Sequence, residues 1–115
     1  MGGGYTTAIA TGTGSIFVAL AALQLPKGSE VVMTPITDPG ALNAVTLQGF
    51  KVSLADSKPG STQSNWQQIE KAITEKTRAI VVVHLGGYAT DIDTIVREAH
   101  NRNIMVIEDC SQATG

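Results

Sequence analysis

The sequence MVIEDCSQATG at residues 105–115 is the stretch from which the fold can be inferred. It opens with consecutive apolar residues, a pattern typical of a strand buried in a parallel sheet. It then becomes polar at once: Glu108 and Asp109 stand where such a strand would end, and Gln112 follows three residues after Asp109. Ligands of open α/β sheets bind outside the carboxyl ends of the strands. The stretch therefore predicts a buried strand that ends at a ligand-binding edge.

The rest of the chain alternates strand patterns with helix patterns. Short apolar runs predict strands, and capped or amphipathic segments between them predict helices. This alternation favours an α/β fold of three layers, with a mostly parallel sheet and helices on both faces. A chain of this length is one domain, residues 1–115. The expected strands cover residues 6–10, 30–34, 50–55, 79–83 and 104–107, and the first helix is expected over residues 16–25.

Three later helices have capping residues at their expected starts. The Asp-Pro pair at residues 38–39 offers a capping acid followed by a proline at the first helical position. Ser64 with Gln67 has the form of a capping box. Thr90 or Asp91 precedes a run with apolar residues at helical spacing. We therefore expect helices to begin at these three places.

Composition excludes several classes of function. Hydrophobic residues make up 43% of the chain and aromatic residues 4%, so Val, Ile, Leu and Ala must build the core, with Trp66 as one aromatic anchor. The net charge of −2 gives no basic footprint for a nucleic acid. No apolar run is long enough for a bilayer, and the amino terminus lacks the basic region and apolar core of a secretory signal. We expect a cytoplasmic protein with neither nucleic-acid nor membrane partners.

The glycine-rich sequence TGTGS at residues 11–15 leads into the first helix. A turn of this kind at a helix start exposes N–H groups that can bind an anion. It has neither the spacing of a Walker loop nor the full dinucleotide fingerprint. On these residues alone, an ordinary strand-to-helix turn is a better interpretation than a phosphate site.

Cys110 is the chain's one cysteine, so it cannot form an intramolecular disulfide. A zinc site would need further ligands, which are not clustered with it in the sequence, and no metal site is predicted. We expect Cys110 to be a small side chain packed below the ligand-binding edge. The alternative, a nucleophilic thiol, needs a histidine partner, for which His84 is the candidate. His84 itself is expected to be a structural hydrogen-bonding residue, and Glu108, on the opposite face from Asp109, to be structural as well.

The stretch at residues 107–115 resembles the Glu-Asp-x-x-Gln-Ala-x-Gly motif of the DegT/DnrJ/EryC1/StrS sugar aminotransferases. These are pyridoxal-phosphate enzymes of the aspartate aminotransferase-like fold type I, and they aminate keto-sugars carried on nucleotides. Further segments resemble the family in the same order: residues 11–14, 28–35, 83–85 and 91–93. The resemblance implies that the chain is the amino-terminal part of the family's large domain.

The resemblance also implies roles for particular residues. Gly12, Thr13 and Gly14 match the phosphate loop, Asp109 the partner of the cofactor's ring nitrogen, and Gln112 the partner of its ring hydroxyl. The family's cofactor lysine lies beyond this motif, and none of the lysines here matches it, so no catalytic residue is assigned. The loop at residues 35–39 also lacks the aromatic residue that stacks on the ring in many members.

Three interpretations of the whole chain stay open on the sequence. It is a fragment or truncated relative of a nucleotide-sugar aminotransferase, inactive alone because the lysine is absent. Alternatively, it is a non-enzymatic binding or oligomerising module, or one half of a split enzyme completed by another chain. The family consists of dimers, and the strand at residues 104–107 is expected to present an open edge, so we expect a homodimer.

Overall fold

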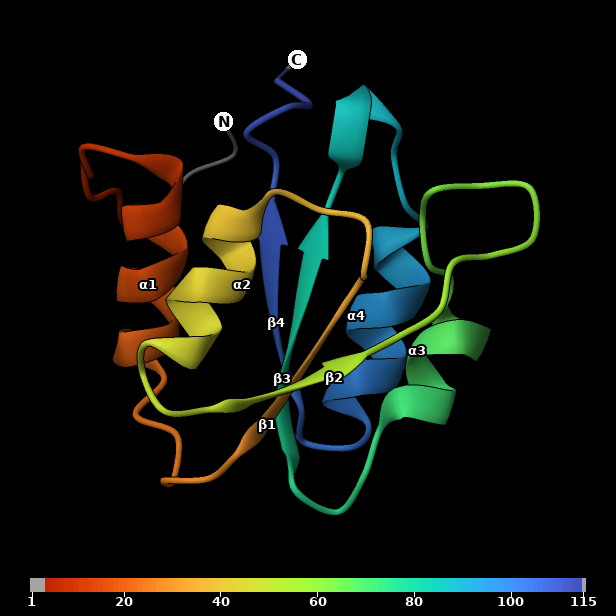
Figure 1. Ribbon diagram of the computed structural model, residues 1–115, viewed down its shortest axis with the longest axis horizontal. Coiled ribbons are helices and arrows are strands. Elements are labelled where there is room, and N and C mark those ends of the chain that lie inside the picture. Colours follow the sequence, from red (N-terminus) through yellow and green to blue (C-terminus); the bar gives the residue numbers. More distant parts are fainter. Residues whose placement is uncertain (1–3, 115) are drawn as a thin grey trace.

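The computed structural model describes residues 4–114 (Figure 1). The first glycines of the chain and Gly115, the last residue of the motif match, lie outside this range. Helices and strands alternate as the sequence predicts. The elements are α1 (Gly12–Ala22), β1 (Glu30–Met33), α2 (Pro39–Thr46), β2 (Lys51–Leu54), α3 (Trp66–Ala72), β3 (Thr77–Val83), the 3-10 turn η1 (Leu85–Gly87), α4 (Ile92–His100) and β4 (Met105–Asp109).

The four strands form one parallel sheet in the order β2-β1-β3-β4. Helices α1 and α2 cover one face, and α3 and α4 cover the other, so the predicted three-layer α/β fold is confirmed (Figure 1). Side chains of successive strand residues point to opposite faces. Val31 and Met33 therefore pack towards α1 and α2, whereas Val32 packs towards α3 and α4.

The sheet order places a topological switch point between β1 and β3. From β1 the chain crosses to β2 on one side, and it returns to β3 on the other side of β1. Because the strands are parallel, all of them end at the same rim. Crevices at this rim, near a switch point, are where open α/β sheets bind ligands.

Residues 6–10 do not form the expected strand. They are exposed and irregular. A strand needs a neighbour for its N–H and C=O groups, and β1 to β4 pair only among themselves within residues 4–114. The prediction was wrong because local sequence cannot supply the missing partner strand.

The first helix begins four residues earlier than expected and also ends earlier. Thr11 is its N-cap, with Oγ1 accepting a hydrogen bond from the Gly14 N–H at 3.0 Å. The helix stops at Ala22, and Gln24 adopts a left-handed φ of 49°. The apolar sequence continues to Leu25, which is why apolar pattern alone extended the helix too far.

The other helix starts agree with the sequence in two of three cases. Asp38 caps α2 with Pro39 at the first helical position, and Asp91 caps α4 by accepting from the Thr94 N–H at 3.3 Å. Helix α3 is capped by Asn65 instead of the expected Ser64. The Ser64 hydroxyl lies near two carbonyl oxygens of the preceding loop, at 3.3 Å from Ala55 O and 2.6 Å from Asp56 O, and is therefore used elsewhere.

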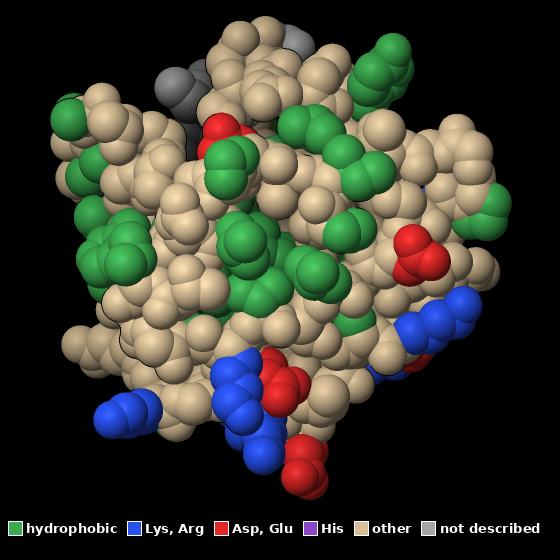
Figure 2. Space-filling model, viewed as in Figure 1, with side chains coloured by type: hydrophobic (Ala, Val, Ile, Leu, Met, Phe, Trp, Pro, Cys, Tyr) green, Lys and Arg blue, Asp and Glu red, His purple; other side chains and the backbone are tan. Residues whose placement is uncertain are grey.

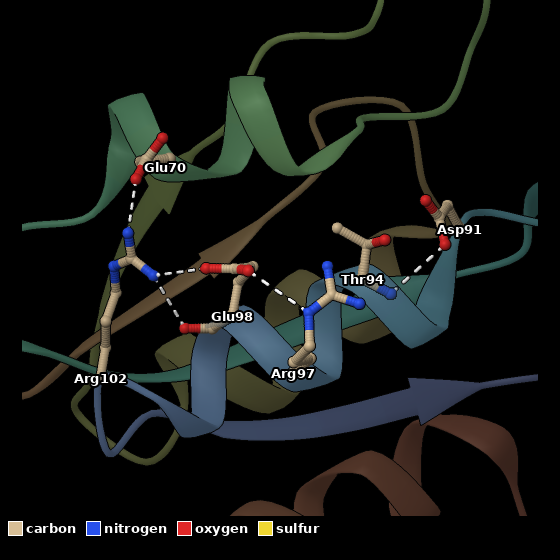
Figure 3. Close-up of polar contacts among 6 residues, drawn as sticks. All are labelled: Glu70, Asp91, Thr94, Arg97, Glu98 and Arg102. Carbon is tan, nitrogen blue, oxygen red and sulfur yellow. Dashed lines mark hydrogen bonds and ion pairs between the residues drawn. The ribbon is translucent and has the colours of Figure 1, made fainter.

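Arg102 links α3 to α4 on the face of the sheet opposite to α1 and α2 (Figure 3). Its guanidinium contacts Glu70 of α3 at 2.6 Å and Glu98 of α4 at 3.1 Å. It also lies 4.8 Å from the centre of the Trp66 ring, a cation–π distance. Trp66 packs against the core below, as predicted for an aromatic anchor.

Within residues 4–114, no helix combines the length and the apolar character that crossing a bilayer requires.

Candidate functional site

A small pocket opens at the carboxyl rim of the sheet, between the start of α1, the start of α2 and the end of β4. Its volume is about 170 Å³. We call it the rim pocket. Four of the five cofactor-binding residues expected from the resemblance line it: Gly12, Thr13, Asp109 and Gln112. The full lining is Gly12, Thr13, Ile16, Asp38, Ala41, Asp109, Ser111 and Gln112.

The start of α1 supplies amide groups to the rim pocket. The Gly14 N–H already donates to the cap, Thr11 Oγ1, and the Ser15 N–H donates to Thr11 O at 2.9 Å. Gly12 and Thr13 come before the first helical hydrogen bond, so their N–H groups remain for an anion. Gly14, the fifth expected residue, does not line the pocket. A side chain there would lie 3.0 Å from Thr11 Oγ1, so its glycine allows the cap to form.

The start of α2 packs directly on the start of α1. Asp38 accepts a hydrogen bond from the Gly40 N–H. A Cβ atom at Gly40 would lie only 2.1 Å from Thr13 Oγ1. Gly40 therefore lets the two helix starts meet at the pocket, a role that its sequence context does not reveal.

Asp109 ends β4 and faces the same side of the sheet as Ile107, towards α1. Its side chain is half-buried, and Oδ1 accepts from the Ser111 N–H at 2.9 Å. Its backbone carbonyl accepts from the His84 N–H at 3.1 Å, which continues the β3–β4 ladder. The carboxylate is thus held at the pocket by its strand and by the turn that follows.

Glu108 points to the opposite face, as expected, and contacts His84. The distance between His84 Nε2 and Glu108 Oε1 is 2.7 Å. On the other side of the ring, Nδ1 accepts from the Thr90 N–H at 3.1 Å. A backbone N–H is always a donor, so Nδ1 carries no proton and Nε2–H donates to Glu108. His84 is buried and hydrogen-bonded at both nitrogens, which confirms its structural interpretation.

Cys110 completes a cluster that its sequence neighbourhood did not reveal. Donor atoms of His84, Glu108 and Cys110 lie within 4.8 Å of one another, because β3 and β4 end side by side. The expectation that no metal ligands gather around Cys110 was therefore wrong. The thiol is also exposed, instead of packed below the rim.

The hydrogen bonds of His84 nevertheless oppose a metal at this cluster. A neutral imidazole that binds a metal through Nε2 carries its proton on Nδ1. At His84 that position is taken by the Thr90 N–H. Neighbouring protein atoms that exclude part of the water around the thiol, together with the negative charges of Glu108 and Asp109, also raise the pKa of Cys110. A thiol that stays protonated at neutral pH is a poor metal ligand and a poor nucleophile.

Gln112 contacts a residue that the sequence had not marked as functional. The Gly86 N–H donates to Gln112 Oε1 at 2.7 Å. Gly86 and Gly87 have φ values of 65° and 79°, which other residues rarely adopt. In the sequence, the two adjacent glycines indicated a turn, but nothing indicated that this turn contacts Gln112.

None of the chain's lysines lines the rim pocket. Lys58 lines a wider hollow of about 520 Å³ between residues 58–65 and 88–91, which contains none of the expected cofactor-binding residues. Lys27, Lys51 and Lys76 surround a hollow near the amino ends of β1 to β3. Lys71 lies on α3, within 3.4 Å of Gln68. Although the wider hollow is larger, we place the candidate site at the rim pocket, where the amides, the carboxylate and the side-chain amide converge.

The chain belongs to the DegT/DnrJ/EryC1/StrS aminotransferase family, whose model matches residues 1–115. It is 39% identical over 111 residues to a GDP-perosamine synthase of Escherichia coli O157:H7, covering 96% of this chain and 30% of that protein. An aminotransferase structure from Psychrobacter cryohalolentis superposes with a TM-score of 0.86 at 38% identity, over 90% of this chain and 26% of that one.

NtdA from Bacillus subtilis, solved with bound cofactor PMP, superposes with a TM-score of 0.85 at 36% identity, over 90% of this chain and 24% of that one. The 115 residues thus span less than a third of the length of these relatives.

Proposed function

We propose that these residues form the part of a nucleotide-sugar aminotransferase that holds the phosphate and the ring of pyridoxal phosphate. The reaction of the parent enzyme would move an amino group from an amino acid such as glutamate to a keto-sugar nucleotide. The observation that carries the proposal is the set of groups around the rim pocket of about 170 Å³: two backbone N–H groups, the Asp109 carboxylate and the Gln112 amide, with a second carboxylate, Asp38, engaged as the cap of α2. Family membership and the relative with bound PMP support it.

The residues of the rim pocket fit this group by their chemistry. The N–H groups of Gly12 and Thr13, at the positive end of α1, would bind the phosphate. The Asp109 carboxylate would hold a proton on the ring nitrogen, since a nearby negative charge favours the protonated form. Gln112 would hydrogen-bond the ring hydroxyl. When bound, pyridoxal phosphate supplies an electron sink, and the chain's part is to bind and orient it.

The amine that covalently carries the cofactor is assigned to residues outside these 115. No lysine of this chain lines the rim pocket, and the reaction needs an amine that loses its proton readily near neutral pH. We therefore propose that this chain alone binds the cofactor without covalent attachment and does not transfer amino groups.

Titration with inorganic phosphate and then with pyridoxal phosphate tests the proposal. We expect the amide NMR signals of Gly12 and Thr13 to shift first, before that of Gly14, which is held by Thr11. Replacing Asp109 with asparagine should weaken pyridoxal phosphate binding about tenfold to hundredfold, as for a lost hydrogen bond to a charged group, and leave phosphate binding unchanged.

The matched control is Asp93→Asn in the first turn of α4, which should leave the affinities for phosphate and for pyridoxal phosphate unchanged. Shifts spread over the surface, with Gly12 and Thr13 unmoved at high phosphate, would show that the start of α1 is only a turn.

We also propose that the 115-residue chain self-associates through β4. This strand pairs with β3 on one side and has no strand on its other side within residues 4–114, and the side chain of Met105 is 46% exposed. An unpaired edge is a template for another chain. Replacing Met105 with lysine should weaken association about tenfold, equivalent to about 1.4 kcal/mol, in sedimentation measured at several concentrations.

The control for β4 uses a second exposed apolar area. Figure 2 shows hydrophobic side chains gathered over α1, α2 and β2, where Phe17, Leu42, Leu47 and Leu54 are exposed. Leu47→Lys should leave association unchanged. If Leu47→Lys dissociates the protein and Met105→Lys does not, the interface lies on this helical face and the proposal for β4 is wrong.

A further inference from the structure

The turn η1 approaches Gln112 at two points. The Gly86 N–H donates to the side-chain oxygen Oε1 at 2.7 Å. A Cβ atom at Gly87 would lie 3.3 Å from the backbone oxygen of Gln112, which is closer than most such contacts. Both glycines have positive φ values, so the close approach and the turn geometry each depend on them.

The turn is anchored from its other side. The Leu85 carbonyl accepts from Gln63 Nε2 at 3.2 Å and from the Tyr88 N–H at 3.3 Å. The other end of the Gln63 amide, Oε1, accepts from the Thr90 hydroxyl at 3.1 Å. His84, just before the turn, is held by Glu108 and Thr90. Because its neighbours fix the turn, the exposed Gln112 side chain adapts to the turn and not the reverse.

We propose that Gly86 is a positioning residue that fixes which end of the Gln112 amide faces the rim pocket. A backbone N–H can be accepted only by the amide oxygen, and a flipped amide would set its NH₂ group against that N–H. Oε1 is therefore held at Gly86, and Nε2, which carries two donors, is the end offered to a ligand.

This orientation makes the rim pocket selective. Asp109 offers an acceptor and Gln112 offers a donor, so a matching ring carries a protonated nitrogen near Asp109 and an acceptor oxygen near Gln112. This statement about the ligand rests on the proposed function. The orientation of the amide does not, because it follows from hydrogen bonds within the chain.

The first experiment tests the orientation without any ligand. In Gln112→Ala, the Gly86 amide should lose its acceptor and exchange with solvent about fivefold to tenfold faster, as for the loss of one hydrogen bond of about 1 kcal/mol. In Gln112→Glu, a carboxylate oxygen still accepts, and Gly86 should stay protected. The control Gln67→Glu, on the exposed face of α3, should change nothing. An unchanged exchange rate of the Gly86 amide in Gln112→Ala would overturn the proposal.

The second experiment compares pyridoxal phosphate with 3-deoxypyridoxal phosphate, which lacks the ring oxygen. The unmodified chain should bind the first about fivefold more tightly. Gln112→Glu, which offers no donor, should lose this preference while Gly86 stays protected, a result that a merely structural role for Gln112 would not produce. An equal preference in both chains would overturn the selectivity. If neither compound binds, the proposed function fails. The orientation of the Gln112 amide is still decided by the exchange rate of the Gly86 amide in the first experiment.

Discussion

Gly40→Ala is expected to lower the free energy of unfolding by about 2–4 kcal/mol. In a helix, replacing glycine with alanine ordinarily stabilises the protein by up to about 1 kcal/mol. A loss of stability in Gly40→Ala would therefore in itself indicate a close contact at this position. The new Cβ would lie 2.1 Å from Thr13 Oγ1 and 2.7 Å from Asp38 Oδ1. Relieving both contacts means displacing the Thr13 side chain from the contact between α1 and α2 and breaking the Asp38 cap. Overpacking costs about 1–3 kcal/mol and a lost cap about 1 kcal/mol.

Urea denaturation of matched variants measures this effect. Gly12→Ala makes the same chemical change at the same pocket, where an added Cβ meets nothing within 4 Å, and should be neutral or slightly stabilising. The double variant Thr13→Ala with Gly40→Ala should recover part of the loss, because the closest contact is removed and the contact with Asp38 remains. If Gly40→Ala behaves like Gly12→Ala, the two helix starts are not in close contact.

His84→Ala is expected to destabilise the chain by a similar amount, about 2–4 kcal/mol. The substitution leaves a cavity at a buried position and removes the acceptor of the Thr90 N–H. Leaving the partly buried Thr90 N–H without its acceptor costs about 1 kcal/mol, and the cavity left by the buried ring adds to this loss. Glu108 contributes less, because its side chain is 42% exposed and water can replace the histidine.

Hydrogen exchange and nitrogen NMR identify the cause of this loss. The Thr90 amide should exchange faster in His84→Ala, and the His84 ring of the unmodified chain should show its proton on Nε2. The control His100→Ala, at the exposed end of α4, should change stability by no more than about 0.5 kcal/mol. A proton found on Nδ1 would contradict the hydrogen-bond assignment, and with it the argument against a metal at Cys110.

Much of the architecture could be predicted from short stretches of sequence. The run of apolar residues at 79–83 predicts a fully buried strand, and Asp38 and Asp91 mark two helix starts, because burial patterns and caps depend on neighbours within a few residues. Residues 6–10 show the limit of such local arguments. Their pattern is that of a strand, yet a strand also needs a partner that no local pattern can provide.

The sequence by itself determined that the chain alternates strands and helices, that Glu108 and Asp109 face opposite sides of a strand, and which residues match the family motif. Those properties follow from the period of the backbone and from residue type. Tertiary structure alone decided that Gly40 meets Thr13, that His84 joins Glu108 and Thr90, that Cys110 is exposed, and that Gly86 holds Gln112. The physical reason is that parallel crossovers bring together strand ends that lie tens of residues apart, and the distances between their side chains depend on packing across the whole sheet.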